Sequence, residues 1–193
     1  MEIEHIKSKS DLHDFLDYEI PQYRHLGKKE RFLDTVTHNP NYLIEKYVIL
    51  LRKTEYYYNN RKNPYYALMY LIYRRRKNNF GMKIGVEIFE NTFDKGLMIY
   101  HAGSIVINKE AQIGKNCKLH GSNCIGNSGK DKKCPVLGDN IRLGVGSSVI
   151  GDVYLADNIT VAAGAVVIHS FREQGVTIGG IPAKVVKGGN CNG

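Results

Sequence analysis

Aliphatic residues return every six positions between Ile99 and Val167, and this spacing predicts short strands joined by tight turns. The first position of each unit is mostly small or aliphatic, and the third is aliphatic with one exception. Gly, Asn or Asp occur at the turns, and one polar unit interrupts the series before Pro135. A short fixed period is typical of a solenoid, in which each unit buries its apolar side only against its neighbours. The pattern therefore predicts a parallel β-helix. The aliphatic third positions are Ile107, Ile113, Leu119, Ile125, Leu137, Leu143, Val149, Leu155, Val161 and Val167.

One residue breaks the aliphatic third column, and that residue is His101. If three units complete one turn, residues about 18 apart lie above one another, so His101 is expected to stack on Leu119 with His120 one step along. Imidazole titrates near neutral pH, which suits it to activate a hydroxyl group as a general base. The alternative is a structural histidine whose polar atoms are satisfied inside the core.

The first third of the chain has a helical period instead. It predicts a helix after a cap at Ser10 that stops at Pro21, a second after the turn at 39–41, and a third from Pro64 that breaks at 78–81. We therefore divide the chain into an α-helical N-terminal region at 1–81, a β-helix domain at 82–188 and a flexible tail at 189–193. The predicted fold class is mainly β, with a small helical region before the repeats.

Charge adds a surface property to the helical region. The chain has 27 Lys and Arg against 19 Asp and Glu, a net charge of +8, and the cations crowd among tyrosines in the first 80 residues. The helix at 64–77 joins an apolar stretch to a cation cluster, which allows peripheral contact with an anionic membrane. The alternative is a helix that packs on the β-helix or on a neighbouring subunit. No reader motif accompanies the charge, so no nucleic acid is expected as a partner.

The remaining bulk properties predict a cytoplasmic protein, with the inner face of the membrane as a further option. No apolar run reaches the length of about 18 residues that spans a bilayer. The first residues, 1–4, lack the basic start of a secretion signal. The four cysteines form no C-x-x-C pair and have no histidine at zinc-ligand spacing, which predicts reduced thiols and no metal site.

The stretches at 97–108, 118–129, 134–144 and 179–186 resemble the hexapeptide-repeat acyltransferases. The chain looks similar to the serine acetyltransferases and closest to the O-acetyltransferases of surface-polysaccharide clusters, such as the colanic-acid type. The resemblance implies a left-handed parallel β-helix, a homotrimer with active sites between subunits, and acetyl-CoA as the acetyl donor without a metal. It also places His101 on the catalytic histidine of the serine acetyltransferases.

Two further residues complete the predicted catalytic group. Glu87 falls near the Asp that orients the catalytic histidine in that family, although the spacing is one residue shorter. Glu90 and Asp94 are alternatives, and all three carboxylates fit an ordinary surface role as well. His120 has a counterpart in the polysaccharide enzymes only, where it would be a second acid or base, a group that binds the acceptor, or a structural corner residue.

Three departures from the serine enzymes favour a different acceptor. That family holds serine with an Asp before the catalytic histidine and with an Arg-His pair, where this chain has Tyr100, Lys133 and Cys134. Without the acidic group the ammonium of serine lacks a counter-charge, and Lys is a weaker carboxylate partner than Arg. We therefore predict O-acetylation of a saccharide hydroxyl in surface-polysaccharide or capsule synthesis. The alternatives are serine O-acetylation in cysteine biosynthesis and a non-catalytic trimeric scaffold at a membrane.

Acetyl-CoA binding is assigned to small residues along the coils, to a loop and to two cations. Small residues at 162–164 let a ligand approach the backbone, and the loop at 127–130 resembles the segment that covers the thiol end in the family. A covalent route through Cys124 or Cys134 is less favoured than direct transfer, because nothing near either thiol in the sequence lowers its pKa. The predicted cofactor-binding residues are Asn127, Ser128, Gly129, Lys130, Gly144, Ala162, Ala163, Gly164, Lys184 and Lys187.

Overall fold

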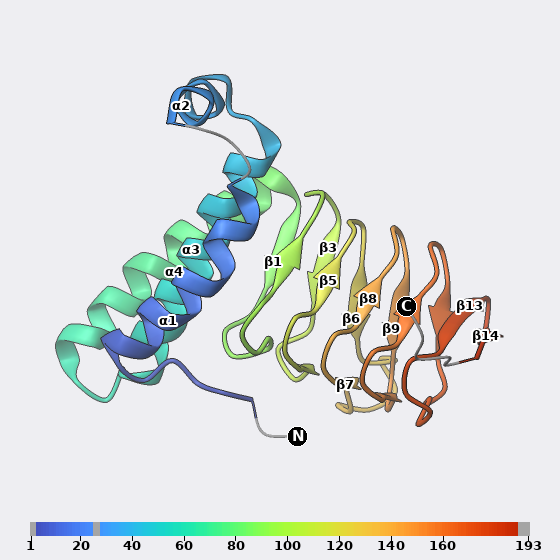
Figure 1. Cartoon of the computed structure of the whole chain (residues 1–193). Helices are drawn as coiled ribbons and strands as arrows, with labels where there is room; N and C mark the ends of the chain where they lie inside the picture. The colour runs from blue at the N-terminus through green and yellow to red at the C-terminus, as the bar shows by residue number, and fades with distance from the viewer. Residues whose placement is uncertain (1–2, 25–27, 189–193) are drawn as a thin grey trace.

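The computed structural model describes residues 3–24 and 28–188, and it places a helical cap at one end of a β-helical prism (Figure 1). The cap contains α1 (Lys9–Glu19), the 3₁₀ turn η1 (Ile20–Tyr23), α2 (Lys28–Thr37), α3 (Pro40–Asn59) and α4 (Pro64–Ile84). Within the described residues, no helix has the length and apolar character that a bilayer crossing requires. The predicted tail at 189–193 lies outside the described residues.

Short polar side chains start three of the helices. Ser8 caps α1 in a reciprocal capping box with Asp11, so the predicted cap at Ser10 is wrong and the helix begins at Lys9. Asn39 caps α3 and Asn63 caps α4, in each case directly before a proline at the first helical position. The helix α2 has no counterpart in the sequence prediction.

The helix α4 continues through 78–81, where the sequence predicts a break, and ends at Ile84. Gly81 is buried inside the helix, and a Cβ there would lie 2.3 Å from the Val86 carbonyl oxygen and 2.9 Å from the Tyr47 ring. This glycine therefore allows α4 to pack closely on the first strand. The chain leaves the helix at Gly85 instead, whose φ of 69° supplies the left-handed turn of a C-cap.

Three parallel sheets form the sides of the prism, because each coil contributes one short strand to each side. Sheet A contains β1 (Val86–Ile88), β3 (Ile105–Ile107), β6 (Cys124–Gly126), β9 (Ser148–Ile150) and β12 (Val166–Val167). Sheet B contains β4 (Gln112–Ile113), β7 (Val136–Leu137) and β10 (Tyr154–Leu155). Sheet C contains β2 (Met98–Ile99), β5 (Lys118–Leu119), β8 (Arg142–Leu143), β11 (Thr160–Val161), β13 (Thr177–Gly180) and β14 (Ala183–Lys187), and β14 runs antiparallel to β13. Each of the aliphatic third-position residues is 0% exposed, so the predicted interior column is confirmed.

Side chains of the cap satisfy the backbone of the first coil. The Tyr47 hydroxyl accepts a hydrogen bond from the Ile88 N–H at 3.1 Å, and Lys77 donates to the Ile88 carbonyl at 2.7 Å. Arg52 donates to two carbonyl groups of the same coil and forms a buried ion pair with Glu19 at 2.6 Å. These bonds close one end of the prism to further strand pairing and hold the cap on the β-helix.

The first coil is longer than the second at its turn from sheet C to sheet A. Ile99 pairs with Leu119, whereas Val106 pairs with Cys124, so the segment between these pairs has two more residues in the first coil. Ile99 therefore fills the aliphatic column, and His101 is exposed on the turn. The prediction that His101 interrupts the column and stacks on Leu119 is wrong, because the six-residue period slips at this turn.

Candidate functional site

The turn from sheet C to sheet A gathers many of the predicted site residues. We call it the histidine corner, and it comprises residues 100–104, 120–122, 144–146 and 162–164 of successive coils. Backbone hydrogen bonds of 2.8 to 3.0 Å join each coil to the next here, from the N–H groups of Tyr100, His120 and Gly144. The site residues on this edge of the prism are Tyr100, His101, His120, Gly144, Ala162, Ala163 and Gly164.

Two imidazoles, those of His101 and His120, lie in the coils of this corner nearest the cap. The rings of Tyr100 and His120 are stacked, with centroids 4.5 Å apart and planes inclined by 20°. Burial, followed by the positive charges of Arg142, His101 and Lys118, lowers the pKa of His120. The neutral form of His120 is therefore favoured more than that of a free imidazole. His101 is exposed, and no hydrogen bond to its side chain occurs in the part of the chain that the structure describes.

Gly121 supports His101 from the next coil. A Cβ on Gly121 would lie 3.2 Å from both the Cβ and the carbonyl oxygen of His101, and the φ of Gly121 is 114°. Any side chain at this position would therefore push against the histidine and strain the turn. The absence of a side chain here fixes where His101 can lie.

Asn123 holds the corner from inside and was not predicted as a site residue. Its side chain is 0% exposed; Oδ1 accepts from the Gly121 N–H at 3.0 Å, and Nδ2 donates to the Gly144 carbonyl at 2.8 Å and to Ser147 Oγ at 3.1 Å. It thus ties two coils of the histidine corner together. The sequence signal was a polar residue in the otherwise small or aliphatic first column.

The small residues farther along the corner are small for two different reasons. A Cβ on Gly144 would lie 2.6 Å from the Ala163 nitrogen, so the stacking of coils alone demands glycine there. A Cβ on Gly164 would meet nothing within 4 Å. Gly164 therefore borders open space, which leaves room for an extended ligand along this part of the edge.

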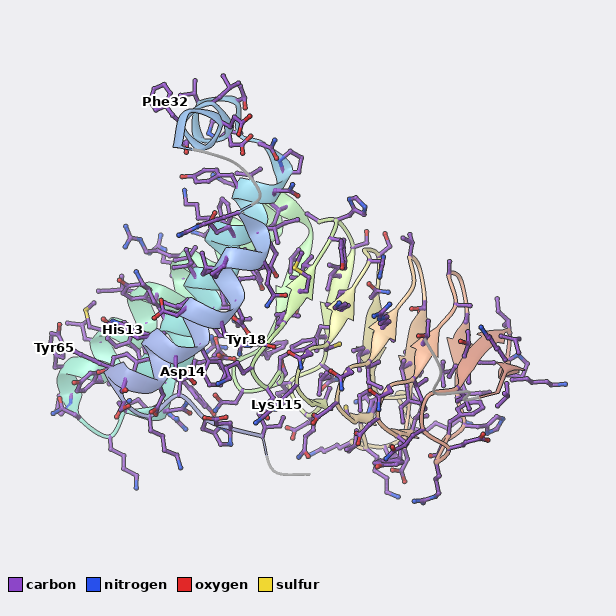
Figure 2. The ribbon with its side chains drawn as sticks, in the orientation of Figure 1. His13, Asp14, Tyr18, Phe32, Tyr65 and Lys115 are labelled. Carbon is purple, nitrogen blue, oxygen red and sulfur yellow. The ribbon has the colours of Figure 1, made fainter. Side chains whose placement is uncertain are left out.

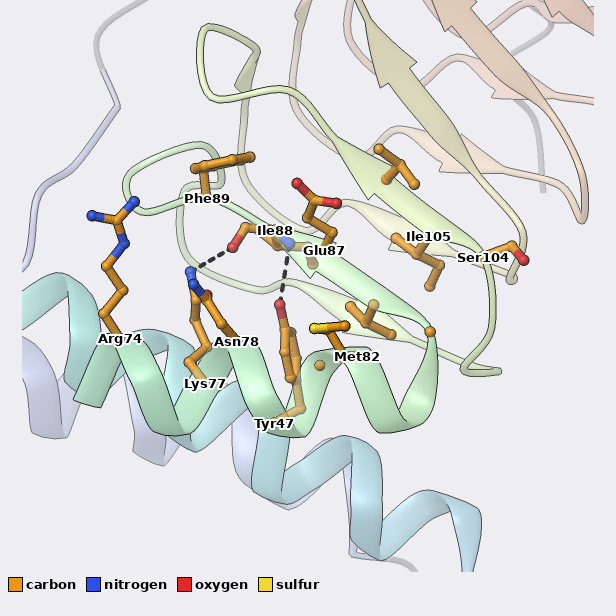
Figure 3. A pocket seen from close by; sticks show the side chains of 14 residues that line it. Tyr47, Arg74, Lys77, Asn78, Met82, Glu87, Ile88, Phe89, Ser104 and Ile105 are labelled. Carbon is orange, nitrogen blue, oxygen red and sulfur yellow. Dashed lines mark hydrogen bonds between the residues drawn. The ribbon is translucent and has the colours of Figure 1, made fainter. Parts of the chain in front are cut away.

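Glu87 lies on the outer face of β1, in sheet A. It lines a cavity of about 450 Å³ between α4 and the first coil, together with Arg74, Lys77 and Ser104 of the histidine corner (Figure 3). Its neighbour in the next coil is Val106. No hydrogen bond joins Glu87 to His101 among the described residues, so the predicted dyad stays a prediction.

The two alternative carboxylates have structural partners. Glu90 accepts a hydrogen bond from Lys77 Nζ at 2.8 Å, and both side chains are nearly buried. Asp94 Oδ1 accepts from the Lys95 N–H at 2.6 Å. Neither group is directed to the histidine corner by these contacts. Glu87 remains the carboxylate of the three without a hydrogen bond or ion pair in the described chain.

The remaining predicted site residues lie on other parts of the prism. The loop at 127–134 leaves the turn from sheet A to sheet B, and most of its side chains are exposed. Within it, the N–H of Gly129 donates to Asn127 Oδ1 at 3.3 Å, and Lys133 pairs with Asp152. Lys184 and Lys187 are exposed on β14, at the end of sheet C farthest from the cap. One protomer therefore does not bring the loop or these lysines to the two histidines.

The thiols near the loop are not activated. Burial raises the pKa of Cys124, and burial, followed by the carboxylates of Glu110 and Asp131, raises that of Cys134. A raised pKa lowers the thiolate fraction at neutral pH, which argues against acetyl transfer through either cysteine. No group of three or more His, Cys, Asp or Glu side chains placed to hold a metal ion occurs in the described residues.

Curated relatives match about half of the chain. A serine acetyltransferase of Synechococcus elongatus is 31% identical over 105 residues, and one of Staphylococcus epidermidis is 32% identical over 106 residues. Each match covers 53% of this chain and 43% or 49% of the relative. The chain thus spans about half the length of the curated relatives that it matches. No family model matches the sequence.

Solved structures resemble nearly the whole chain. The serine acetyltransferase of Neisseria gonorrhoeae gives a TM-score of 0.70 at 24% identity, over 96% of this chain and 70% of that one. The serine acetyltransferase of Brucella abortus in complex with coenzyme A gives 0.67 at 22% identity, over 95% and 71%. These structures are left-handed β-helices, so the predicted left-handed β-helix with preceding helices is confirmed.

The comparisons contradict one prediction about function. The two curated relatives named above are serine acetyltransferases, so the predicted saccharide acceptor and the role in polysaccharide synthesis are wrong. The closer resemblance to colanic-acid-type enzymes is not supported either. The inference of a saccharide rested on three side chains, Tyr100, Lys133 and Cys134, and the latter two lie on a different edge of the protomer from His101.

Proposed function

We propose that the protein transfers the acetyl group of acetyl-CoA to the hydroxyl group of L-serine. The observation that carries this proposal is the 31–32% identity to serine acetyltransferases over 105 and 106 residues. The arrangement of His101, His120 and the small residues of the corner supports the same chemistry. Serine O-acetylation was the alternative to the saccharide reaction in the sequence analysis.

In the proposed reaction His101 is the general base. The serine hydroxyl is a weak nucleophile at neutral pH, so His101 takes its proton as the oxygen attacks the thioester carbonyl. The C–S bond then breaks, and the departing CoA thiolate takes the proton back from the imidazolium. Exposure of His101 on an outer edge of the prism gives both substrates access to its ring.

His120 and Tyr100 assist at the same corner. Tyr100 directly precedes His101 in the chain, and its stacking partner His120 lies in the next coil. The lowered pKa of His120 keeps its ring neutral near pH 7. A neutral imidazole can donate a hydrogen bond to the acceptor or to the developing oxyanion without adding charge. We assign His120 to acceptor positioning and Glu87 to orientation of the base.

Acetyl-CoA is assigned to the coils of the histidine corner farther from the cap. The small residues there leave the backbone accessible, and the open space at Gly164 allows a chain-like ligand to pass. Lys184 and Lys187 lie toward the same end of the prism and carry the positive charge that the nucleotide phosphates need. The loop at 127–130 is assigned to the thiol end.

A homotrimer would unite these parts. In one protomer the loop at 127–134 is separated from His101, because it lies at the turn from sheet A to sheet B. A neighbouring prism packed at the histidine corner would bring its own loop or sheet to the two histidines. A mass near three times 21.8 kDa by light scattering would support this assembly, and a monomeric mass in an active preparation would contradict it.

The test of the proposed function is a CoA-thiol release assay. Purified protein and acetyl-CoA are incubated with L-serine, with D-serine, with L-homoserine and with no acceptor. We expect release only with L-serine or far faster with it, with O-acetylserine identified by mass spectrometry. If thiol release is no faster with L-serine than without an acceptor, the proposed substrate is wrong.

A further inference from the structure

The outer side of the helical cap carries a groove between α3 and α4. It has a volume of about 620 Å³, and no residue of the β-helix lines it. Half-buried aromatic rings lie within it: Lys46 Nζ is 5.1 Å from the Phe80 ring centroid, and the Arg76 guanidinium is 6.0 Å from that of Tyr73. We call this feature the outer groove. Its lining includes Lys46, Lys53, Tyr73, Arg76, Phe80 and Lys83.

An exposed apolar stripe of α4 extends the outer groove toward the start of that helix. Tyr65, Leu68 and Ile72 are 61%, 58% and 42% exposed, and their spacing of three and four residues places them on one face. The buried residues Lys77 and Gly81 mark the opposite face, which packs on the first coil. Tyr65 projects from the end of the cap away from the prism (Figure 2).

The surface around the outer groove is positively charged without internal compensation. No Asp or Glu occurs between Tyr56 and Val86. The one carboxylate in the groove lining, that of Glu45, bonds to Arg24 at 2.6 Å. Within residues 3–24 and 28–188, no ion pair involves the cations of the groove, which are Lys46, Lys53, Arg76 and Lys83. A surface of this kind attracts an extended anionic partner.

A lipid bilayer matches this surface better than a second copy of the chain does. Two copies that met through the outer groove would place like charges face to face. Anionic headgroups would neutralise the cations, while aliphatic side chains such as Leu68 and Ile72 enter the boundary of the acyl chains. We propose that the outer groove and the apolar stripe of α4 dock this protein on the surface of an anionic bilayer.

The test is co-sedimentation with vesicles. Vesicles of phosphatidylcholine with about 30% phosphatidylserine are compared with pure phosphatidylcholine, at low salt and at high salt, since charge attraction is screened within a Debye length. We expect the protein to sediment with the anionic vesicles only and to be released by salt. No sedimentation with anionic vesicles at low salt would overturn the proposal.

Two charge-reversal variants separate a specific surface from net charge. The groove variant carries Lys46→Glu, Arg76→Glu and Lys83→Glu, and the control carries Lys109→Glu, Lys132→Glu and Arg172→Glu, so both lower the net charge equally. Each Lys or Arg near an anionic membrane adds to the binding free energy. The groove variant loses three such cations, so its partitioning into anionic vesicles should fall about 100-fold or more. The control should stay within a few-fold of the unaltered chain. Equal losses in the two variants would overturn the proposal.

A third variant tests the apolar stripe and the rival occupant. Leu68→Ser with Ile72→Ser should weaken binding about tenfold while leaving the salt dependence in place, because it removes buried aliphatic area and no charge. Unchanged binding would remove the stripe from the docking surface. Light scattering on the groove variant completes the test: a smaller assembly than that of the unaltered chain would assign the groove to contacts between copies and overturn the bilayer proposal.

Discussion

Two edges of the same prism make the same backbone turn with different residues. At the turn from sheet B to sheet C, Asn116, Asn140 and Asn158 occupy the left-handed conformation with φ of 58°, 57° and 62°. Their amides form a ladder, in which Asn116 Nδ2 donates to Asn140 Oδ1 at 3.2 Å and Asn140 Nδ2 donates to Asn158 Oδ1 at 3.1 Å. The turn from sheet C to sheet A, the histidine corner, has no such ladder.

The comparison of the two turns shows which residues the coil itself requires and which it does not. A tight corner needs a residue that tolerates positive φ, and Asn meets that need while also bonding to its neighbours. The histidine corner meets it with Gly103, Ser104, Gly121 and Ser122, which leaves the adjoining positions free for other side chains. The edge with the repeated asparagines therefore has a structural role. The histidine corner, where the turn residues do not repeat, is the edge that carries the candidate site residues.

The largest expected effect is on the reaction rate, from a substitution in the histidine corner. His101→Ala should lower the serine-dependent rate of CoA release by about 10² to 10⁴, as expected when a general base is removed. The melting temperature should not change, because His101 is exposed and has no hydrogen bond in the described chain. Steady-state kinetics and thermal melts on the same samples check both expectations.

The matched control is His169→Ala, which removes another exposed histidine from a different part of the prism. It should leave the rate unchanged. Equal rates for His101→Ala and the unaltered protein would remove His101 from the mechanism. That outcome, together with intact biological function, is what the alternative of a non-catalytic scaffold predicts.

Gly121→Ala should have the second-largest effect. The added methyl group would meet His101 at 3.2 Å and would force an unfavourable φ, so the imidazole should shift. A displacement of about 1 Å at a reacting group can cost about 10²-fold in rate. Gly126→Ala is the control, because its Cβ would meet Asn108 at an ordinary 3.8 Å. If both alanine variants keep the full rate, Gly121 does not position His101.

The interior of the β-helix could be predicted from the sequence because the period itself encodes burial. From Ile107 to Val167, every aliphatic third-position residue is fully buried. The same period misplaced His101, since two extra residues at one turn shifted the register without disturbing the sequence pattern. Only strand pairing reveals such a slip.

The site could be predicted in part. His101 and His120 were singled out by residue type, and the structure places them on one corner with the predicted small residues. Asn123 was missed because its role depends on a backbone N–H and a carbonyl that the fold brings to it. The position of Glu87 relative to His101 depends on which side of the prism each strand occupies, and sequence spacing does not show that.

The asparagine edge should respond in stability and not in rate. Asn140→Ala keeps a left-handed residue without the amide ladder and should cost about 1–2 kcal/mol in the free energy of unfolding. For a chain of this length that is a fall of about 2–8 °C in melting temperature. Asn140→Gly relieves the backbone strain and should recover part of the loss. A change in the serine-dependent rate in either variant would contradict the separation of the two edges.

The smallest expected effect is a shift in the pKa of His120 in the histidine corner. Burial and then the charge of Arg142 lower the pKa of His120, and Arg142→Gln removes the second of these causes. The imidazolium becomes less unfavourable, so the pKa of His120 should rise toward the ordinary value of about 6.5 while burial keeps it below that value. Because the folded pKa lies below the unfolded one, His120 costs stability as pH falls through 6.5, and the variant should reduce that cost. An NMR titration of the imidazole protons measures the shift, with Arg172→Gln as the control on a distant surface; an unchanged or lowered pKa would show that Arg142 does not act on this ring.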